Sequence, residues 1–100
     1  MPSYVHTHLG FLLLAMIQQE PRDVHSVRRE LRERFGARSI PSAQLVYSVL
    51  HYLQRNRLIR PLPADPRRYQ LTVSGRRSLK MRTREWESFA NGAEALLHGA

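Results

Sequence analysis

The charged side chains of this sequence are unevenly distributed. Asp65 is the only acidic residue between positions 34 and 84, whereas arginine and lysine recur throughout that stretch. The other acids lie before or after it, and the whole chain has a formal net charge of +8. A guanidinium group presents paired donors that fit phosphate oxygens and the edge of guanine. The basic middle stretch therefore predicts a polyanionic partner, which can be DNA, RNA or an anionic membrane surface.

Residue types for other chemistry are missing or scattered. The sequence has no cysteine, which excludes disulfides, thiolate metal sites and thiol nucleophiles. The histidines, at positions 6, 8, 25, 51 and 98, do not have the spacing of a zinc site. We find no ordered serine–histidine–aspartate set, no paired carboxylates and no glycine-rich phosphate loop. We therefore expect a protein that is not an enzyme and that needs no metal or cofactor.

The elements that must position the basic residues begin with an apolar helix. Thr7 is a candidate N-cap for a helix that runs to about Gln19, and Glu20-Pro21 ends it. The apolar run from Leu9 to Ile17 is much shorter than the ~20 residues that a membrane span requires. Its flanks also lack the pattern of a signal peptide. We interpret it as the central helix of a core, and we expect a cytoplasmic protein with no membrane partner.

Two amphipathic helices should follow. Asp23 is a good N-cap for a helix over residues 24–35, which Gly36 ends. Ser42 is the corresponding N-cap for a helix from Ala43 to about Asn56. The predicted inward residues of the two helices are Val24, Val27, Leu31 and Phe35, and then Leu45, Val46, Val49, Leu50 and Leu53.

A hairpin and a long last helix complete the predicted order. Residues 58–62 and 68–72 alternate as strands do, and Pro63-Ala64-Asp65-Pro66 between them is typical of a turn. Thr72 can cap a helix that runs from about residue 73 to 97. The fold class is therefore mainly α with a small β-hairpin. We predict a winged helix-turn-helix over residues 1–72, followed by a dimerisation helix over residues 73–100. We call the helix after Ser42 the reader helix, and residues 58–72 the wing.

At this point the sequence resembles the PadR family of bacterial transcriptional regulators. The two stretches that carry the resemblance are LVYSVLHYL at residues 45–53 and RYQLTVSGRRSL at residues 68–79. The chain departs from the family pattern at Val24-His25, at Gln44 and at Arg57. At the position of Arg57 the family usually has glycine. A non-glycine residue there would strain a left-handed turn unless Asn56 takes that conformation instead.

The reader helix and the wing supply the predicted DNA contacts. Gln44 can pair with adenine, and Ser48 and His51 can reach bases or phosphates. The resemblance implies that Tyr47 contacts the phosphate backbone, and the alternative for Tyr47 is a half-buried core ring. The remaining predicted DNA-binding residues are Ser42, Arg55, Arg60, Arg67, Arg68, Arg76 and Arg77. The alternative for this surface is a solvated face that binds nothing.

The last helix predicts a homodimer. Leu79, Trp86, Phe89, Ala93 and Leu96 fall at heptad spacing that only Arg82 interrupts, and Leu97 adjoins them. The alternative is packing against the first helix of the same chain. In some PadR-like proteins an aromatic residue of this helix lines an effector pocket at the dimer interface, so the resemblance adds a small aromatic effector near Trp86.

The predicted function is a dimeric DNA-binding transcriptional regulator, acting as a repressor that occupies a pseudo-palindromic operator. A second hypothesis is a winged-helix adaptor or anti-regulator that binds a protein and no specific DNA sequence. A third is non-specific coating of nucleic acid. The polar and basic face of the reader helix favours the first hypothesis.

Overall fold

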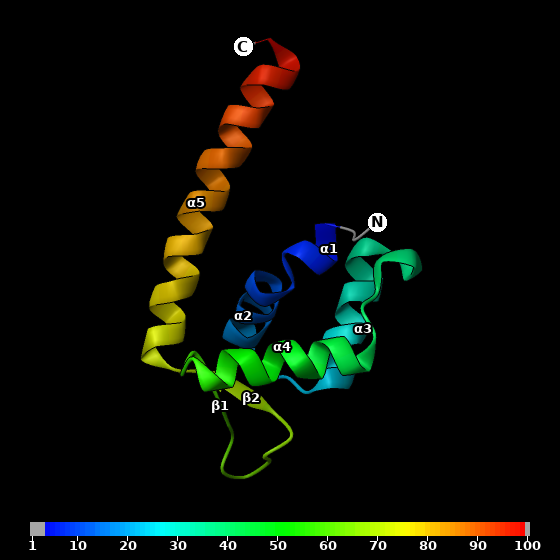
Figure 1. The fold of residues 1–100 in the computed structure, drawn as a ribbon, viewed down its shortest axis with the longest axis vertical. Helices are drawn as coiled ribbons and strands as arrows, with labels where there is room; N and C mark the ends of the chain where they lie inside the picture. The colour runs from blue at the N-terminus through cyan, green and yellow to red at the C-terminus, as the bar shows by residue number, and fades with distance from the viewer. Residues whose placement is uncertain (1–3, 100) are drawn as a thin grey trace.

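The computed structural model describes residues 4–99, apart from the side chain of Ser39, so residues 1–3 and 100 of the predicted division lie outside it. The order is mainly helical with one hairpin and a long final helix, as predicted (Figure 1). The elements are α1 (Tyr4–Thr7), α2 (Leu9–Gln19), α3 (Val24–Phe35), the 3₁₀ helix η1 (Ala37–Ser39), α4 (Ala43–Arg55), β1 (Ile59–Pro61), β2 (Tyr69–Leu71) and α5 (Val73–His98).

Three helices begin at the predicted N-caps. The Asp23 carboxylate accepts a hydrogen bond from the Ser26 amide at 2.7 Å. The Ser42 hydroxyl accepts one from the Leu45 amide at 3.1 Å. The Thr72 hydroxyl accepts one from the Gly75 amide at 2.9 Å. Each such cap contributes about 1 kcal/mol, which explains why these boundaries can be predicted from the sequence.

The predicted cap at Thr7 is wrong. Thr7 is the last residue of α1, and α2 begins after His8, whose side chain makes no capping hydrogen bond. The helical hydrogen-bond pattern continues across the break, because the His8 amide donates to the Tyr4 carbonyl and the Leu12 amide donates to the His8 carbonyl, both at 3.0 Å. The chain therefore stays helical from α1 into α2, and no side-chain cap marks the start of α2.

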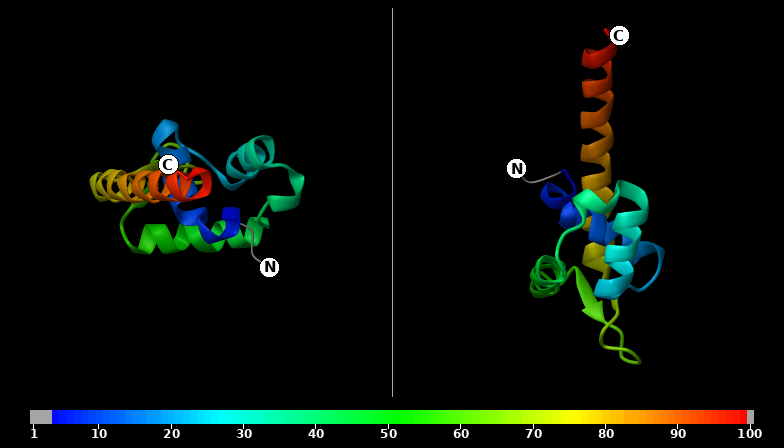
Figure 2. Two further views of the ribbon diagram at one scale, coloured as in Figure 1. Left: turned by 90° about the horizontal axis from the view of Figure 1, so that it is seen from above. Right: turned by 90° about the vertical axis from the view of Figure 1, so that its right-hand side faces the viewer.

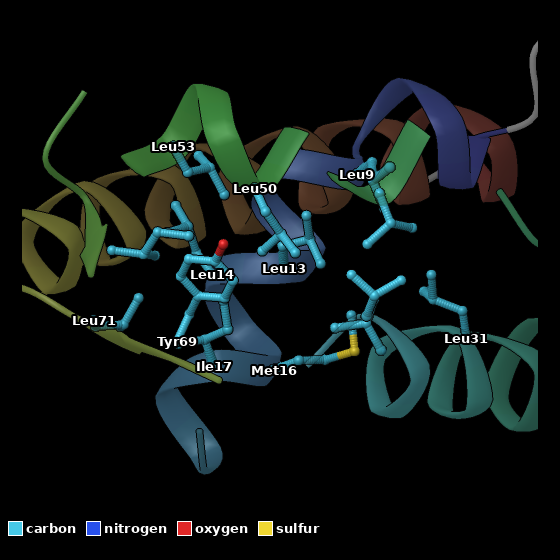
Figure 3. Packing of buried hydrophobic residues seen from close by; sticks show 14 of the residues in the cluster. Leu9, Leu13, Leu14, Met16, Ile17, Leu31, Leu50, Leu53, Tyr69 and Leu71 are labelled. Atoms are coloured by element: carbon cyan, nitrogen blue, oxygen red, sulfur yellow. The ribbon is translucent and has the colours of Figure 1, made fainter. Parts of the chain in front are cut away.

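The core forms around α2, which packs against α4, α5 and β2. Its buried leucines and Ile17 meet side chains from α3, α4 and the hairpin (Figure 3). The predicted stripe of α3 is buried at Val24, Val27 and Leu31. Phe35 is the exception, since 46% of it is exposed. It lies at the end of α3 over a shallow groove between α2 and α3, which explains why its ring is only partly covered.

The wing is a short antiparallel hairpin with a third strand-like partner. Ile59 pairs with Leu71 and Pro61 with Tyr69. On the other edge of β2, the backbone of Arg22 exchanges hydrogen bonds with Tyr69 at 2.9 and 3.3 Å. The chain just before α3 is therefore tied to the base of the wing.

The side chain of Arg22 is buried, and no pattern in the sequence predicts this. Its guanidinium forms an ion pair with Glu30 at 2.7 Å and donates to the Met16 carbonyl at 3.3 Å. Glu30 also pairs with Arg34 at 2.9 Å, and residues four apart on a helix are well placed for such a pair. Burial alone would raise the pKa of Glu30, but hydrogen bonds and charges from Arg34 and Arg22 hold that pKa below the ordinary value for glutamate. This network fixes the end of α2 against α3.

The turn between α4 and β1 has an unusual residue at its centre. Arg57 adopts φ +61°, whereas Asn56 stays at φ −86°. The Arg57 amide donates to the Gln54 carbonyl at 2.9 Å, and the Leu58 amide donates to the Leu53 carbonyl at 3.0 Å. These are the two hydrogen bonds of a Schellman motif, which usually has glycine at the left-handed position. An ordinary side chain there costs about 1–2 kcal/mol.

The start of α5 is packed tightly against this turn. A Cβ atom on Gly75 would overlap the backbone carbonyl of Leu58. The Thr72 hydroxyl, besides capping α5, donates to the Arg57 carbonyl at 2.6 Å. Glycine at position 75 is therefore required by the close approach of two backbones.

The second half of α5 extends away from the rest of the molecule (Figure 1). The helix packs on α2 near its start, where Leu79 is buried in the core. Further along, Phe89, Leu96 and Leu97 are exposed, and Leu96 has 88% of its surface accessible. The alternative of packing against the same chain therefore describes only the start of α5.

Candidate nucleic-acid interface

The reader helix α4 lies on the outside of the body next to the hairpin (Figure 2). Its inward side chains Val46, Leu50 and Leu53 are buried, as predicted. Its outer face is exposed and almost entirely polar. The exposed residues on this face are Ser42, Gln44, Tyr47, Ser48, His51, Tyr52 and Arg55.

The polar side chains of α4 differ in whether they already make hydrogen bonds within the protein. The Ser48 hydroxyl donates to the Gln44 carbonyl at 3.0 Å, and the Ser42 hydroxyl caps the helix. Each hydroxyl oxygen can still accept a hydrogen bond from water. Both serines can therefore contact a DNA phosphate through a bridging water molecule. The Gln44 side chain makes no hydrogen bond to residues 4–99, so its amide retains both a donor and an acceptor for a base edge.

Tyr47 lies on the rim of this face. It is 48% exposed, and its ring is 6.2 Å from that of His51 with an interplanar angle of 42°. Tyr69 of the wing is buried, and this burial raises the pKa of Tyr69 above the ordinary value for tyrosine, with Tyr47 adding to the effect. About half of Tyr47 is therefore accessible to a partner.

The wing arginines are exposed but share one acidic neighbour. Arg67 pairs with Asp65 at 3.4 Å, and Arg68 lies 4.0 Å from the other oxygen of the same carboxylate. Arg60 projects from β1 and is exposed. Solvent-exposed ion pairs of this kind are worth about 0–1 kcal/mol, so a phosphate can replace Asp65 at little cost.

The two predicted arginines of α5 are less closely joined to this surface. Both are exposed in the first turns of the helix. Arg76 lines a small hollow with Gln18, Glu20 and Gln70, beside the end of α2 and not beside α4. The structure thus brings the reader helix and the wing together and places Arg76 at the margin.

Arg57 was missed as a candidate from the sequence. It is exposed at the point where the reader helix ends and the wing begins. The available signal was arginine at a position where the PadR pattern has glycine.

A separate hollow of about 610 Å³ lies between the start of α2, α4 and α5. The Trp86 ring is 5.9 Å from that of His8 and 6.2 Å from that of Phe89. Arg82 also lines it and makes no ion pair with residues 4–99. Trp86, beside which the resemblance implies a small aromatic effector, thus borders a hollow that also contains Phe89.

The predicted dimerisation set is divided by the structure. Leu79 is only 4% exposed and belongs to the core of its own chain, so it is not available to a partner helix. It faces α2 because it lies only two turns from the start of α5, where that helix is packed on the body. Trp86, Phe89, Leu96 and Leu97 are exposed, and Ala93 is partly exposed.

Two negative observations apply to the described residues. Within residues 4–99, no group of three or more histidine, aspartate or glutamate side chains is arranged to hold a metal ion. No helix in the same range has the length and apolar character needed to cross a membrane.

Comparison with known proteins shows the fold. A PadR-like transcriptional regulator from Bacillus cereus has a TM-score of 0.81 and 20% identity, with 96% of this chain and 97% of that chain covered. A PadR family regulator from Clostridium difficile has a TM-score of 0.78 and 18% identity, covering 90% and 98% of the two chains. A Streptococcus transcriptional regulator has a TM-score of 0.74 and 25% identity, covering 94% and 97%. No protein-family model matches this chain, and no curated protein matches it in sequence. The chain has the fold of PadR-like winged-helix regulators, which confirms the resemblance at the level of the fold.

Proposed function

We propose that this chain, with its PadR-like winged-helix fold, is a DNA-binding transcriptional regulator and not an enzyme. The observation that carries the proposal is the outer face of α4, which is polar, free of acids and flanked by the wing arginines. The solved structures with the same fold are described as transcriptional regulators. The proposal places the protein in the cytoplasm, where its DNA target would be.

This surface would make two kinds of contact with DNA, one to base edges and one to the phosphate backbone. Gln44, near the start of α4, would enter the major groove and read a base edge, with Ser48 and His51 beside it. Arg60, Arg67 and Arg68 would follow the phosphate backbone, with Arg55, Tyr47 and the start of α5 adding contacts. Charge therefore supplies affinity, and a few uncharged side chains supply sequence preference.

We further propose that the protein is a homodimer whose exposed half of α5 packs against the same helix of a second copy. A helix of 26 residues is about 39 Å long, and its exposed apolar side chains lie well beyond the core. Two-fold pairing would present two reader helices to a pseudo-palindromic site. Repression would follow from occupancy of a promoter by this dimer.

The test begins with binding of labelled duplex DNA over a salt series. Affinity should fall by at least about tenfold between 50 and 200 mM salt, because several phosphate contacts release counterions. An affinity that hardly changes would contradict the phosphate-contact surface. Capture of a protein partner together with no DNA binding at low salt would favour the adaptor hypothesis.

Sequence preference is tested by selection from a random duplex library. Gln44→Ala should change the selected motif, whereas the double change Arg67→Ala with Arg68→Ala should weaken binding to all duplexes alike. Gln54→Ala is the matched control, because it removes the same exposed amide from the other end of α4. Identical motifs for Gln44→Ala and the control would contradict the assignment of Gln44 as a base reader.

A small aromatic effector is the remaining part of the proposal. The hollow beside Trp86 contains aromatic rings and the guanidinium of Arg82, so a planar ligand would quench the fluorescence of the only tryptophan. Titration with a panel of aromatic compounds tests this directly. A Trp86 signal that no compound changes would remove the effector from the proposal.

A further inference from the structure

The turn at Arg57 has the one left-handed non-glycine residue in the described part of the chain. The conformation is imposed by the surroundings. Its amide and its carbonyl are both hydrogen-bonded, to the Gln54 carbonyl at 2.9 Å and by the Thr72 hydroxyl at 2.6 Å. The next residues enter the core through Ile59. The backbone at position 57 is therefore fixed by contacts on both sides, whatever the side chain is.

Glycine and asparagine are the residues that tolerate this conformation best. Arginine is strained there, and nothing within the described chain compensates for it. The Arg57 side chain is exposed and makes no hydrogen bond or ion pair to residues 4–99. The nearest acid along the basic stretch, Asp65, is engaged with Arg67 and Arg68.

The position of Arg57 indicates what compensates for the strain. It lies after the last turn of the reader helix and two residues before β1. Positive charge at this junction would continue the row that starts with Arg55 and reaches Arg60. Strained residues that persist against the local preference of the backbone are concentrated at functional sites.

We propose that Arg57 is a DNA-backbone contact, in which its guanidinium binds a phosphate between the segments contacted by the reader helix and by the wing. This rests on the proposed function and adds a residue to its surface. The tight anchoring of the Arg57 backbone would present the guanidinium from a rigid point, which reduces the entropy lost on binding.

The experiment separates backbone strain from side-chain function. Arg57→Gly relieves the strain and removes the charge, Arg57→Asn does the same with a side chain retained, and Arg57→Lys keeps both charge and strain. Each full-length variant is measured by thermal denaturation and by fluorescence anisotropy with a labelled mixed-sequence duplex of about 30 base pairs, long enough for two half-sites.

We expect Arg57→Gly to melt about 2–6 °C higher than the parent protein. Its affinity for the duplex should be about five- to tenfold lower for each bound copy, and its salt slope smaller by about 0.9 per copy, the value for one phosphate contact. Arg57→Asn should show the same loss of affinity, and Arg57→Lys should retain affinity within about twofold. Arg84→Ala, which removes the same charge from the middle of α5, should change the affinity much less.

Two results would overturn the proposal. One is an Arg57→Gly protein with the affinity and salt slope of the parent, and the other is a loss of affinity in Arg84→Ala that equals the loss in Arg57→Gly. The change of both wing arginines to alanine serves as the reference. If that variant loses affinity while Arg57→Gly does not, only the role of Arg57 fails. If neither loses affinity, the DNA-binding function itself fails.

Discussion

Removal of the buried guanidinium of Arg22 should strongly destabilise the fold. Only 7% of Arg22 is exposed, and its change to methionine would leave the Glu30 carboxylate, whose side chain is 14% exposed, without its 2.7 Å partner. Breaking a buried ion pair in this way typically costs about 3–5 kcal/mol. We expect the lower end, about 3 kcal/mol, because Arg34 continues to pair with Glu30. That is a large part of the ~5–15 kcal/mol that stabilises a small domain.

The assay is urea denaturation followed by far-ultraviolet circular dichroism, at one protein concentration for all variants. Arg34→Ala is the matched control, since it removes the other partner of Glu30 but is 65% exposed in its side chain, and should cost about 0.3–0.5 kcal/mol. Arg22→Met combined with Glu30→Leu should recover much of the loss, because no buried charge is left unpaired and Arg34, which loses its partner, is 65% exposed in its side chain. An Arg22→Met protein no less stable than Arg34→Ala would refute the reasoning.

The Arg22–Glu30 ion pair also predicts the direction in which stability changes with pH. Because Arg34 and Arg22 lower the pKa of Glu30 in the folded state, the unfolded chain binds its proton more readily, and stability rises with pH through this range. The contribution is complete above the unfolded pKa of about 4.3 and is lost as the pH falls through the folded pKa. As the pH is lowered through this range, the free energy of unfolding of the parent protein should therefore fall more steeply than that of Arg22→Met.

Three other changes test separate features. Phe89→Ser with Leu96→Ser should weaken self-association by at least about a hundredfold in sedimentation velocity, because each copy loses two apolar contacts of about 1.5–3 kcal/mol. Gly75→Ala should cost more than about 2 kcal/mol in thermal denaturation, since the new methyl group must displace the Leu58 carbonyl. Asp65→Asn should raise the affinity for duplex DNA about two- to fivefold at low salt in anisotropy measurements, because it frees both wing arginines from an ion pair.

Each of these has an outcome that contradicts it. Val73→Ala removes an exposed apolar side chain from the opposite end of α5, and an equal loss of self-association there would remove the dimer face from residues 89–97. A Gly75→Ala protein as stable as the parent would mean that the turn relaxes easily. An unchanged affinity in Asp65→Asn would show that its carboxylate does not compete with phosphate.

The parts that the sequence predicts well are those decided by local chemistry. The caps at Asp23, Ser42 and Thr72 and the polar outer face of α4 depend on residues within one or two turns. The cap predicted at Thr7 was wrong because a short helix, α1, precedes α2 and the helical hydrogen bonds continue from one to the other, which no local pattern reveals. Leu79 was assigned to the dimer face but is buried in its own chain, because heptad spacing identifies an apolar stripe on α5 and not the element that packs against each part of that stripe.

Long-range features were beyond local reasoning. The burial of Arg22 depends on Glu30, eight positions away, and on the strand-like pairing of its backbone with Tyr69. The sequence did indicate that either Asn56 or Arg57 would be left-handed, but the choice depends on the hydrogen bond from Thr72, fifteen residues later. The order of the elements, by contrast, followed from caps, apolar stripes and turn residues, and the family resemblance agreed with that order.

The pairing of Arg22 with Tyr69 also governs how the sheet behaves toward other molecules. It covers the outer edge of β2, so β1 is the edge that remains open to a further strand. That edge is three residues long and contains Arg60 and Pro61, a charge and a residue without a backbone donor, which both oppose addition of a foreign strand. The hairpin is thereby protected from edge-to-edge aggregation, and the proposed dimer would form only through the apolar face of α5.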